Sequence, residues 1–165
     1  MAWRNYGKGY QKIRGSPLHN LIACGLAFTE VVPLKPRDLW TLLILCNFGE
    51  SSQSTTRTRC MLLLDSLEMA DAKRFEPEIR KFVQDIYKTQ GRPETKDAIY
   101  RIPFLVPEVP QQRDGEACGS FVLYFINLFL QKAPEIFNMN GYPYFMNKNW
   151  FTLEGLVDFF EYSMR

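Results

Sequence analysis

Two almost uninterrupted apolar runs constrain the fold of this chain more than any other feature. The first is Trp-Thr-Leu-Leu-Ile-Leu-Cys, residues 40–46, and the second is Cys-Met-Leu-Leu-Leu, residues 60–64. A strand with one face in water alternates apolar and polar residues, whereas neither of these runs has a polar face. Both runs therefore predict strands of a sheet that other parts of the chain cover on each side.

Helical periodicity and shorter apolar stretches predict the remaining elements. Five apolar residues recur with the period of one helix face: Ile79, Phe82, Val83, Ile86 and Tyr87. Such a stripe predicts an amphipathic helix, which Gly91-Arg92-Pro93 ends. Residues 121–130 predict a central buried helix, residues 152–162 a terminal helix with one apolar face, and residues 102–106 a third strand. Since no βαβ unit repeats, the sequence predicts an α+β fold.

The first 38 residues carry the weakest pattern. Glycines and prolines interrupt any period there, and the short apolar stretch 21–28 fits either a strand or a single helical turn. Residues 1–29 contain four bases and no acid, which is +4, and the whole chain carries +2, so the remaining residues carry −2. We therefore divide the chain into a basic N-terminal segment, 1–38, and a domain over 39–165.

Composition excludes several classes of function. A net charge of +2 is too small for the basic field of a nucleic-acid-binding domain. The longest apolar run, residues 121–126, is too short to cross a bilayer, so we expect no membrane segment. The four cysteines have no CxxC spacing and His19 is the only histidine, so we expect no zinc site and no cofactor. Free thiols in a reducing compartment fit this composition.

Three polar residues are candidates for chemistry. Cys118 follows a polar, glycine-containing loop and precedes the predicted central helix. The free N–H groups of a helix start favour a thiolate, although a cysteine here could equally be a small buried residue. Gln112 could donate to an oxyanion or simply be solvated, and Asp65 could orient a base or cap the turn after its strand. Taken one at a time, these residues leave both alternatives open.

Taken in order, the same residues resemble the Ulp/SENP family of ubiquitin-like-specific cysteine proteases, particularly its plant branch. The family has His-Trp at the head of one strand, Asp after the next strand, and Gln-x-x-Gly-x-x-Cys-Gly before a central helix. Trp40 and Asp65 occupy the first two places. The last motif is matched with its spacing intact at four positions: Gln112, Gly115, Cys118 and Gly119.

The resemblance implies a papain-like fold in which helices flank a central mixed sheet. It makes Cys118 the nucleophile, Asp65 the acid of the triad and Gln112 the oxyanion donor. Trp40 and Gly119 would bind the substrate, with Trp40 beside the narrow channel that admits two glycines. The implied activity is cleavage after the Gly-Gly end of SUMO, or another ubiquitin-like protein, in precursors and conjugates. No cofactor or metal takes part, and the implied compartment is the nucleus or cytoplasm.

One position departs from the family pattern. Leu39 stands immediately before Trp40, where the family carries its catalytic His. A cysteine protease needs a base to form the thiolate and an acid to protonate the leaving amine, and leucine supplies neither. Loss of the His of a comparable triad costs on the order of 10⁶-fold in kcat. We therefore expect weak or absent turnover. We also expect that the N-terminal part of the family domain is truncated or replaced in this chain, with the divergent segment 1–38 in its place.

Two alternatives to an active peptidase remain open at this stage. The chain could be a pseudoprotease that binds a ubiquitin-like modifier or another protein partner without cutting it. It could also be a product with no stable role, because elements that the family uses are replaced and core surface could be left uncovered. Cooperative unfolding of the purified chain would argue against the last alternative.

Overall fold

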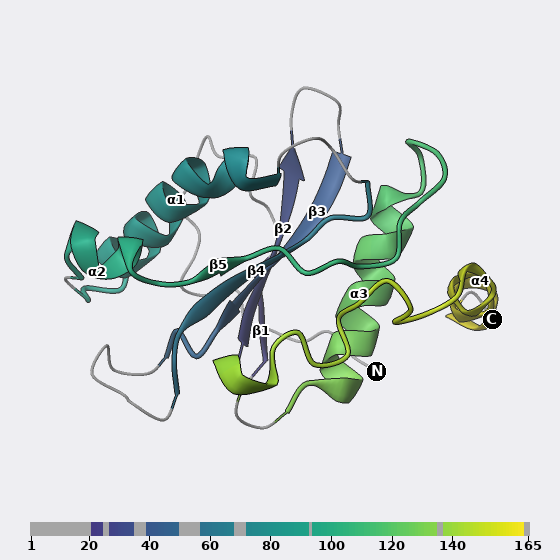
Figure 1. Ribbon diagram of the computed structural model, residues 1–165. Coiled ribbons are helices and arrows are strands. Elements are labelled where there is room, and N and C mark those ends of the chain that lie inside the picture. Colours follow the sequence, from purple (N-terminus) through teal and green to yellow (C-terminus); the bar gives the residue numbers. More distant parts are fainter. Residues whose placement is uncertain are drawn as a thin grey trace.

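The computed structural model describes residues 21–24, 27–34, 39–49, 57–67, 72–92, 94–134 and 137–163. Within these residues the chain forms one five-stranded sheet with helices on its two faces (Figure 1). The strands are β1 Leu21–Cys24, β2 Ala27–Leu34, β3 Leu39–Cys46, β4 Cys60–Leu64 and β5 Phe104–Leu105. The α-helices are α1 Glu76–Thr89, α2 Lys96–Tyr100, α3 Cys118–Lys132 and α4 Leu153–Ser163, with short 3₁₀ turns at Ala72–Phe75 and Met139–Gly141.

The sheet is mixed, as predicted. Its order is β1-β2-β3-β4-β5, in which the first four strands are antiparallel and β5 runs parallel to β4. β5 keeps only two residues of the predicted strand 102–106. Pro103 and Pro107 flank it, and because proline has no N–H group it cannot extend the ladder as a donor. The carbonyl of Pro103 still accepts a hydrogen bond from the Met61 N–H group at 2.9 Å.

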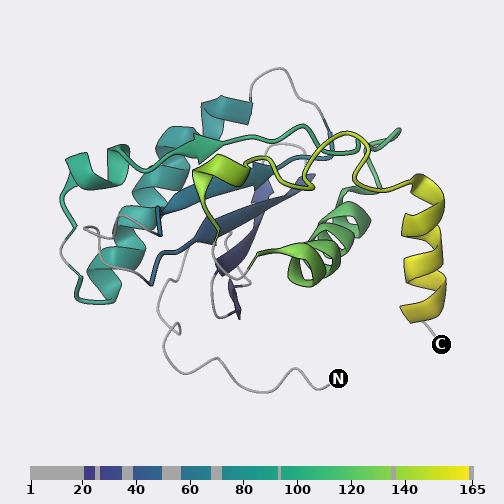
Figure 2. The ribbon, with the colours of Figure 1, turned by 60° about the horizontal axis from the view of Figure 1, so that its bottom comes forward.

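The central strands β3 and β4 are buried on both faces, which confirms the expectation from their apolar runs. One core cluster joins one face of the two strands to Phe121 and Phe125 of α3, and its strand residues are Leu42, Ile44, Leu62 and Leu64. The other cluster joins the opposite face to Ile79 and Val83 of α1, and its strand residues are Leu43, Leu45, Met61 and Leu63. The two views agree that α1 and α3 lie on opposite faces of the sheet (Figure 2). Each fully buried side chain of this kind stabilises the fold by roughly 1.5–3 kcal/mol relative to exposure.

Helix α1 confirms the predicted amphipathic helix. Glu76, Pro77 and Glu78 begin it, a composition that suits the free N–H groups and the positive end of a helix dipole. Its buried stripe includes Ile79, Val83, Ile86 and Tyr87. Gly91 follows the helix with φ +65°, a left-handed conformation that an L side chain adopts only with strain.

Helix α3 is only partly buried, which corrects the expectation of a helix enclosed on all sides. Phe121, Phe125 and Phe129 are buried, whereas Leu123 is 53% exposed and Leu130 is 48% exposed. The reason is architectural: α4 and the segment before it cover α3 only in part, through contacts to Tyr124 and Phe125, and leave Leu123 and Leu130 exposed. Helix α4 lies beyond α3 at the edge of the molecule (Figure 2).

The segment between α3 and α4 returns across α3 through aromatic contacts. Trp150 stacks on Phe125 with ring centroids 5.5 Å apart, and Tyr124 contacts Phe151 at 4.8 Å and Phe159 at 5.0 Å. Gly141 is required in this segment, because a Cβ atom there would lie 2.2 Å from the ring of Tyr144. These contacts anchor the terminal helix α4 to α3.

Strands β1 and β2 lie in the part of the chain where the sequence pattern was weakest. The strand alternative for residues 21–28 is the one observed, and β2 pairs with β3 along its whole length, from Ala27 opposite Cys46 to Leu34 opposite Leu39. The division proposed at 38/39 therefore falls between two paired strands of one sheet. The basic residues of 1–20, with His19, lie outside the described residues.

Candidate active site

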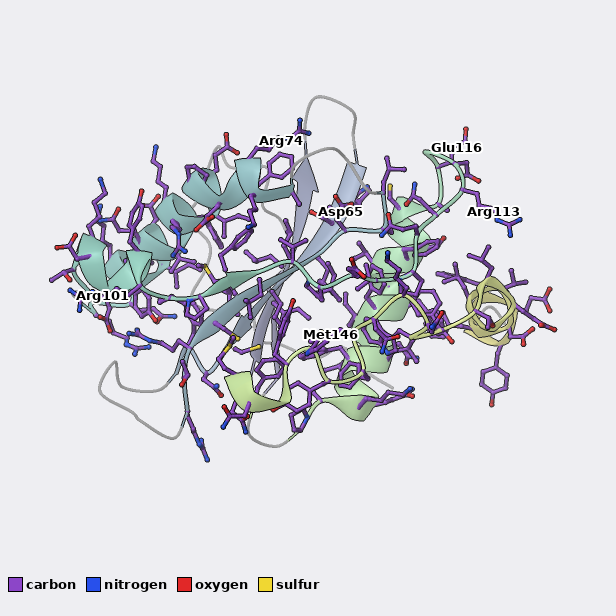
Figure 3. All side chains as sticks on the ribbon, viewed as in Figure 1. Asp65, Arg74, Arg101, Arg113, Glu116 and Met146 are labelled. Carbon is purple, nitrogen blue, oxygen red and sulfur yellow. The ribbon has the colours of Figure 1, made fainter. Side chains whose placement is uncertain are left out.

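The residues of the family motif come from three elements that meet at one end of the sheet. Leu42 of β3 lies opposite Leu64 of β4 in an antiparallel pair, so the beginning of β3 and the residue after β4 share that end. Asp65 is the residue after β4, and Figure 3 shows it at the same end as the loop carrying Arg113 and Glu116, which leads into α3. The start of β3, Asp65 and the start of α3 are thereby gathered in one region.

Cys118 is the first residue of α3, which confirms that a helix begins at this cysteine. Its side chain is 5% exposed, and its thiol is free. The loop before it is fixed by Asp114, whose Oδ1 accepts hydrogen bonds from the N–H groups of Glu116 at 3.0 Å and Ala117 at 3.1 Å. The thiol therefore stands at a helix start that has no side-chain cap, since the N-cap residue is Ala117, and Asp114 orders the turn just before it.

Asp65 is a half-buried carboxylic acid. Burial raises the pKa of its carboxyl above the ordinary value of 3.8, against the lowering effects of the Leu67 N–H group and the charge of Arg74. The Leu67 N–H group donates to Oδ1 at 3.0 Å, so Asp65 does cap the turn after β4, which was one of its two predicted roles. The carboxylate accepts this hydrogen bond through one oxygen, so its second oxygen can accept a hydrogen bond from another partner.

Gln112 is buried and hydrogen-bonded, so the alternative of a solvated loop amide is wrong. Its backbone N–H group donates to the Ser66 carbonyl at 2.7 Å, and its Oε1 accepts from the Ser66 hydroxyl at 2.7 Å. Its Nε2 donates to the carbonyl of Asp114. Gln112 therefore joins the segment after β4 to the loop that precedes Cys118.

Gln111 adds a second connection between the same two segments. Its Nε2 donates to the carbonyl of Asp65 at 2.9 Å and to that of Val109 at 3.0 Å. Sequence reasoning missed both Gln111 and Ser66 as site residues. The available signal was their position beside Gln112 and Asp65, but their partners lie 46 residues away in the sequence, which no local pattern predicts.

The two predicted substrate-binding residues are accessible. Trp40, the second residue of β3, is 40% exposed, whereas the strand residues that follow it, Thr41 and Leu42, are buried. Gly119 is half-buried, and a Cβ atom built on it would meet nothing within 4 Å. The packing of the chain therefore does not require glycine at 119, and open space lies beside the residue that follows Cys118.

Leu39 is the first residue of β3, and its backbone pairs with Leu34 of β2. The placement of its side chain lies outside what the structure describes. The orientation of position 39 toward Cys118 and Asp65 thus remains a prediction.

The described parts of the chain hold neither a metal-binding cluster nor a membrane-spanning helix. Among those residues no group of three or more His, Cys, Asp or Glu side chains could hold a metal ion. None of the helices described here has the length and apolar character needed to cross a membrane.

Comparison with known proteins gives this geometry a context. No protein-family model matches the chain. Probable ubiquitin-like-specific protease 2A of Arabidopsis thaliana is 28% identical over 130 residues, covering 73% of this chain and 17% of that protein. Probable ubiquitin-like-specific protease 2B is 28% identical over 137 residues, with 73% and 14% covered, and ubiquitin-like-specific protease 1D is 28% identical over 131 residues, with 73% and 22% covered.

These sequence relatives are plant ubiquitin-like-specific proteases. The finding supports the resemblance drawn from the Gln112 to Gly119 motif. The chain spans 14–22% of the length of these three relatives. A solved de-sumoylating protease shows 20% sequence identity and a TM-score of 0.49, over 64% of this chain and 38% of that one.

Proposed function

We propose that this chain is a ubiquitin-like-specific cysteine peptidase domain whose turnover is weak or absent because position 39 carries leucine. The observation that supports it best is the joining of the Asp65 segment to the loop before Cys118, through Ser66, Gln111 and Gln112. Cys118 is the nucleophile, Asp65 the acid of the triad and Gln112 the oxyanion donor. The substrate is SUMO or another ubiquitin-like protein, in precursors and conjugates.

The proposed reaction needs a nucleophile, an oxyanion donor and a group that transfers protons, and in this proposal the chain supplies the first two. The Cys118 sulfur forms a bond to the carbonyl carbon of the last glycine, and negative charge develops on the carbonyl oxygen, where an amide donor stabilises it. The C–N bond then breaks, and the leaving amine must take a proton before water hydrolyses the thioester. Leu39 can neither take the proton of the thiol nor give one to the amine, and Asp65 has no imidazole beside Trp40 to orient, so thiolate formation and amine release are both impaired.

The accessible residues suit a slender substrate end. A Cβ atom at Gly119, the residue after Cys118, would meet nothing within 4 Å, and an exposed Trp40 offers a flat apolar surface at the start of β3. Two consecutive glycines need little width and gain contact area from an aromatic wall. This combination favours a tail ending in Gly-Gly over a bulky side chain next to the cleaved bond.

A modifier that carries an electrophile after its Gly-Gly end tests the proposal. The probe should label Cys118 rather than Cys46 or Cys60, which are also buried but lie inside strands. Trp40→Ala should slow this labelling severalfold while leaving the rate with iodoacetamide unchanged, because the small reagent needs no docking surface. Mass spectrometry of the modified peptides measures both rates. Labelling of Cys118 no faster than of Cys46 and Cys60 would contradict the assignment of the nucleophile.

The second candidate is a pseudoprotease that binds a ubiquitin-like modifier without cutting it, and Leu39 is the observation that favours it. In that case Cys118→Ala should leave binding nearly unchanged, whereas Trp40→Ala should abolish it. Isothermal titration calorimetry with a SUMO-like modifier ending in Gly-Gly measures the affinity. No binding at high micromolar modifier would count against this candidate.

A further inference from the structure

Ser66 makes two hydrogen bonds with the proposed oxyanion residue. Its hydroxyl donates to Oε1 of Gln112 at 2.7 Å, and its carbonyl accepts the Gln112 backbone N–H group at 2.7 Å. Ser66 is 1% exposed and Gln112 is 7% exposed, so water does not compete freely for either contact. Residue 66 thus holds both the backbone and the side chain of residue 112.

The partners of Gln112 fix which end of its amide is the donor. An amide group has nearly the same shape when its nitrogen and oxygen are exchanged, so its orientation must be decided from its hydrogen bonds. The group near one end is the backbone carbonyl of Asp114, which can only accept. That end must therefore be the nitrogen, the other end must be Oε1, and the Ser66 hydroxyl must be its donor.

We propose that Ser66 is a positioning residue that holds the amide of Gln112 with its NH₂ end toward the loop before Cys118. The inference rests on the proposed function in one respect, namely that Gln112 serves the substrate oxygen. The amide nitrogen carries two hydrogens, and the bond to Asp114 uses one, so the second is the donor left for a developing oxyanion. Without the Ser66 hydroxyl the oxygen end of the amide loses its donor, and the single bond to Asp114 is left to hold the NH₂ end in place.

A structural role alone would predict something different. If Ser66 only fills space after β4, its replacement should lower stability without changing the exchange of the Gln112 amide protons. If Ser66 positions the amide, Ser66→Ala should release those protons even in a chain that remains folded. The backbone bond from Gln112 to the Ser66 carbonyl survives in Ser66→Ala, so the loop itself stays attached.

Side-chain amide NMR on the full chain labelled with ¹⁵N-glutamine tests this directly, and Gln112→Ala assigns the resonances. We expect Ser66→Ala to speed exchange of the Gln112 side-chain protons about tenfold, which is the loss of one buried hydrogen bond. Ser66→Thr, which keeps the hydroxyl, should restore slow exchange. Ser120→Ala, at a half-buried serine of α3, is the matched control and should change nothing. Exchange in Ser66→Ala within twofold of the unmodified chain would overturn the proposal.

Kinetics separate this inference from the proposed function. In a Leu39→His background, Ser66→Ala should lower kcat about tenfold at unchanged KM, less than the 10²–10³-fold expected for complete loss of an oxyanion donor in Gln112→Ala. A Leu39→His chain with no turnover would count against the proposed function, and the amide exchange would still decide the role of Ser66. A matched fall of kcat in Ser66→Ala and Ser66→Thr would contradict positioning by the hydroxyl.

Discussion

Asp65 carries a charge where the fold makes charge unfavourable. Burial raises the pKa of its carboxyl in the folded chain above 3.8, the ordinary value taken for the unfolded one. The contribution of this group to stability is therefore fully present below pH 3.8 and is lost as the pH rises through the higher folded-state pKa. Retaining a carboxylate there at neutral pH fits a residue kept for function rather than for stability.

Asp65→Asn should consequently raise the melting temperature at pH 7. Asparagine keeps an oxygen to accept the Leu67 N–H group and removes the charge that burial disfavours. The gain should shrink as the pH falls and vanish below about pH 3.8, where the aspartic acid is itself neutral. Thermal melts followed by circular dichroism across this pH range measure it. A lower melting temperature at pH 7 would mean that the Asp65 charge is stabilised by contacts stronger than its desolvation.

The sequence predicted the motif residues but not the contacts among them. Cys118 begins a helix and Asp65 follows a strand, as their neighbours in the sequence indicate, because those features depend on local periodicity. The buried state of Gln112 and the roles of Ser66 and Gln111 depend on two segments 46 residues apart meeting in space. Only the fold brings such partners together.

At the scale of elements, the apolar patterns predicted the two central strands and the amphipathic helix that packs on them. The strands Leu39–Cys46 and Cys60–Leu64 and the helix Glu76–Thr89 lie where their patterns indicated. The five-residue helix Lys96–Tyr100 was missed, since one turn with a Thr95 cap shows no period. Exposure along one side of α3 was missed as well, because a pattern reports how apolar a helix is and not how many layers cover it.

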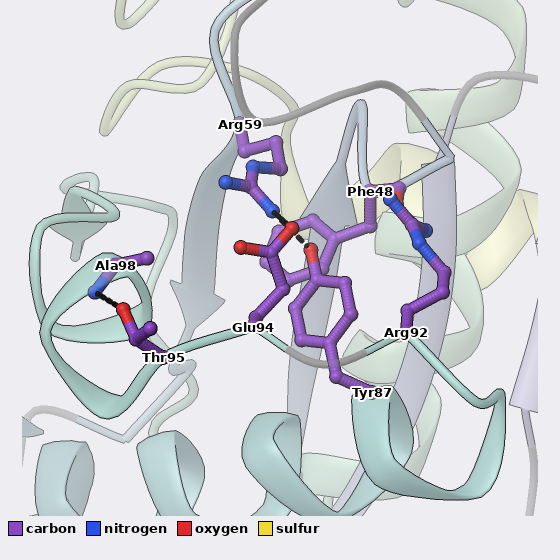
Figure 4. Close-up of polar contacts among 7 residues, drawn as sticks. All are labelled: Phe48, Arg59, Tyr87, Arg92, Glu94, Thr95 and Ala98. Atoms are coloured by element: carbon purple, nitrogen blue, oxygen red, sulfur yellow. Dashed lines mark hydrogen bonds and ion pairs between the residues drawn. The ribbon is translucent and has the colours of Figure 1, made fainter.

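A buried polar cluster fixes the start of β4 to the end of α1 (Figure 4). Arg59 donates to the Tyr87 hydroxyl at 2.7 Å and forms an ion pair with Glu94 at 3.0 Å, with side chains 9% and 14% exposed. Arg92 completes the cluster, because it lies over the Tyr87 ring at 5.0 Å and donates to the carbonyl of Phe48. The cluster lies at the beginning of β4, whereas Asp65 follows the end of that strand.

Removing one partner of this ion pair should be costly. Arg59→Met leaves the Glu94 carboxylate nearly buried without its cation, which costs about 3 kcal/mol of unfolding free energy. The double variant Arg59→Met with Glu94→Gln should recover part of that loss. Lys88→Met is the control, because Lys88 and Asp85 are an exposed pair 3.9 Å apart, worth less than about 1 kcal/mol. Urea unfolding measures all three, and an Arg59→Met chain within 0.5 kcal/mol of the control would contradict this account.

Over the whole molecule, one sheet serves both cores and the candidate site. The residues of β3 and β4 face α1 and α3 alternately, so the end of the sheet that carries Asp65 is held from both sides. The mixed sheet between helices was predictable from the sequence, whereas the pairing of β2 with β3 was not, because residues 1–38 show no clear period. The proposed function places a nucleophile, an acid and an oxyanion donor on this frame, and it confines the defect to one residue at the start of β3.

Cleavage of modifier precursors by Leu39→His tests this central claim most directly. The unmodified chain should cut a precursor extended beyond its Gly-Gly end slowly or not at all, because leucine can neither take nor give a proton. Leu39→His should raise kcat by several orders of magnitude, and the added substitution Cys118→Ala should abolish the gain. Rapid cleavage by the unmodified chain, or no gain in Leu39→His under conditions where the modifier binds, would contradict the assignment of the missing base to position 39.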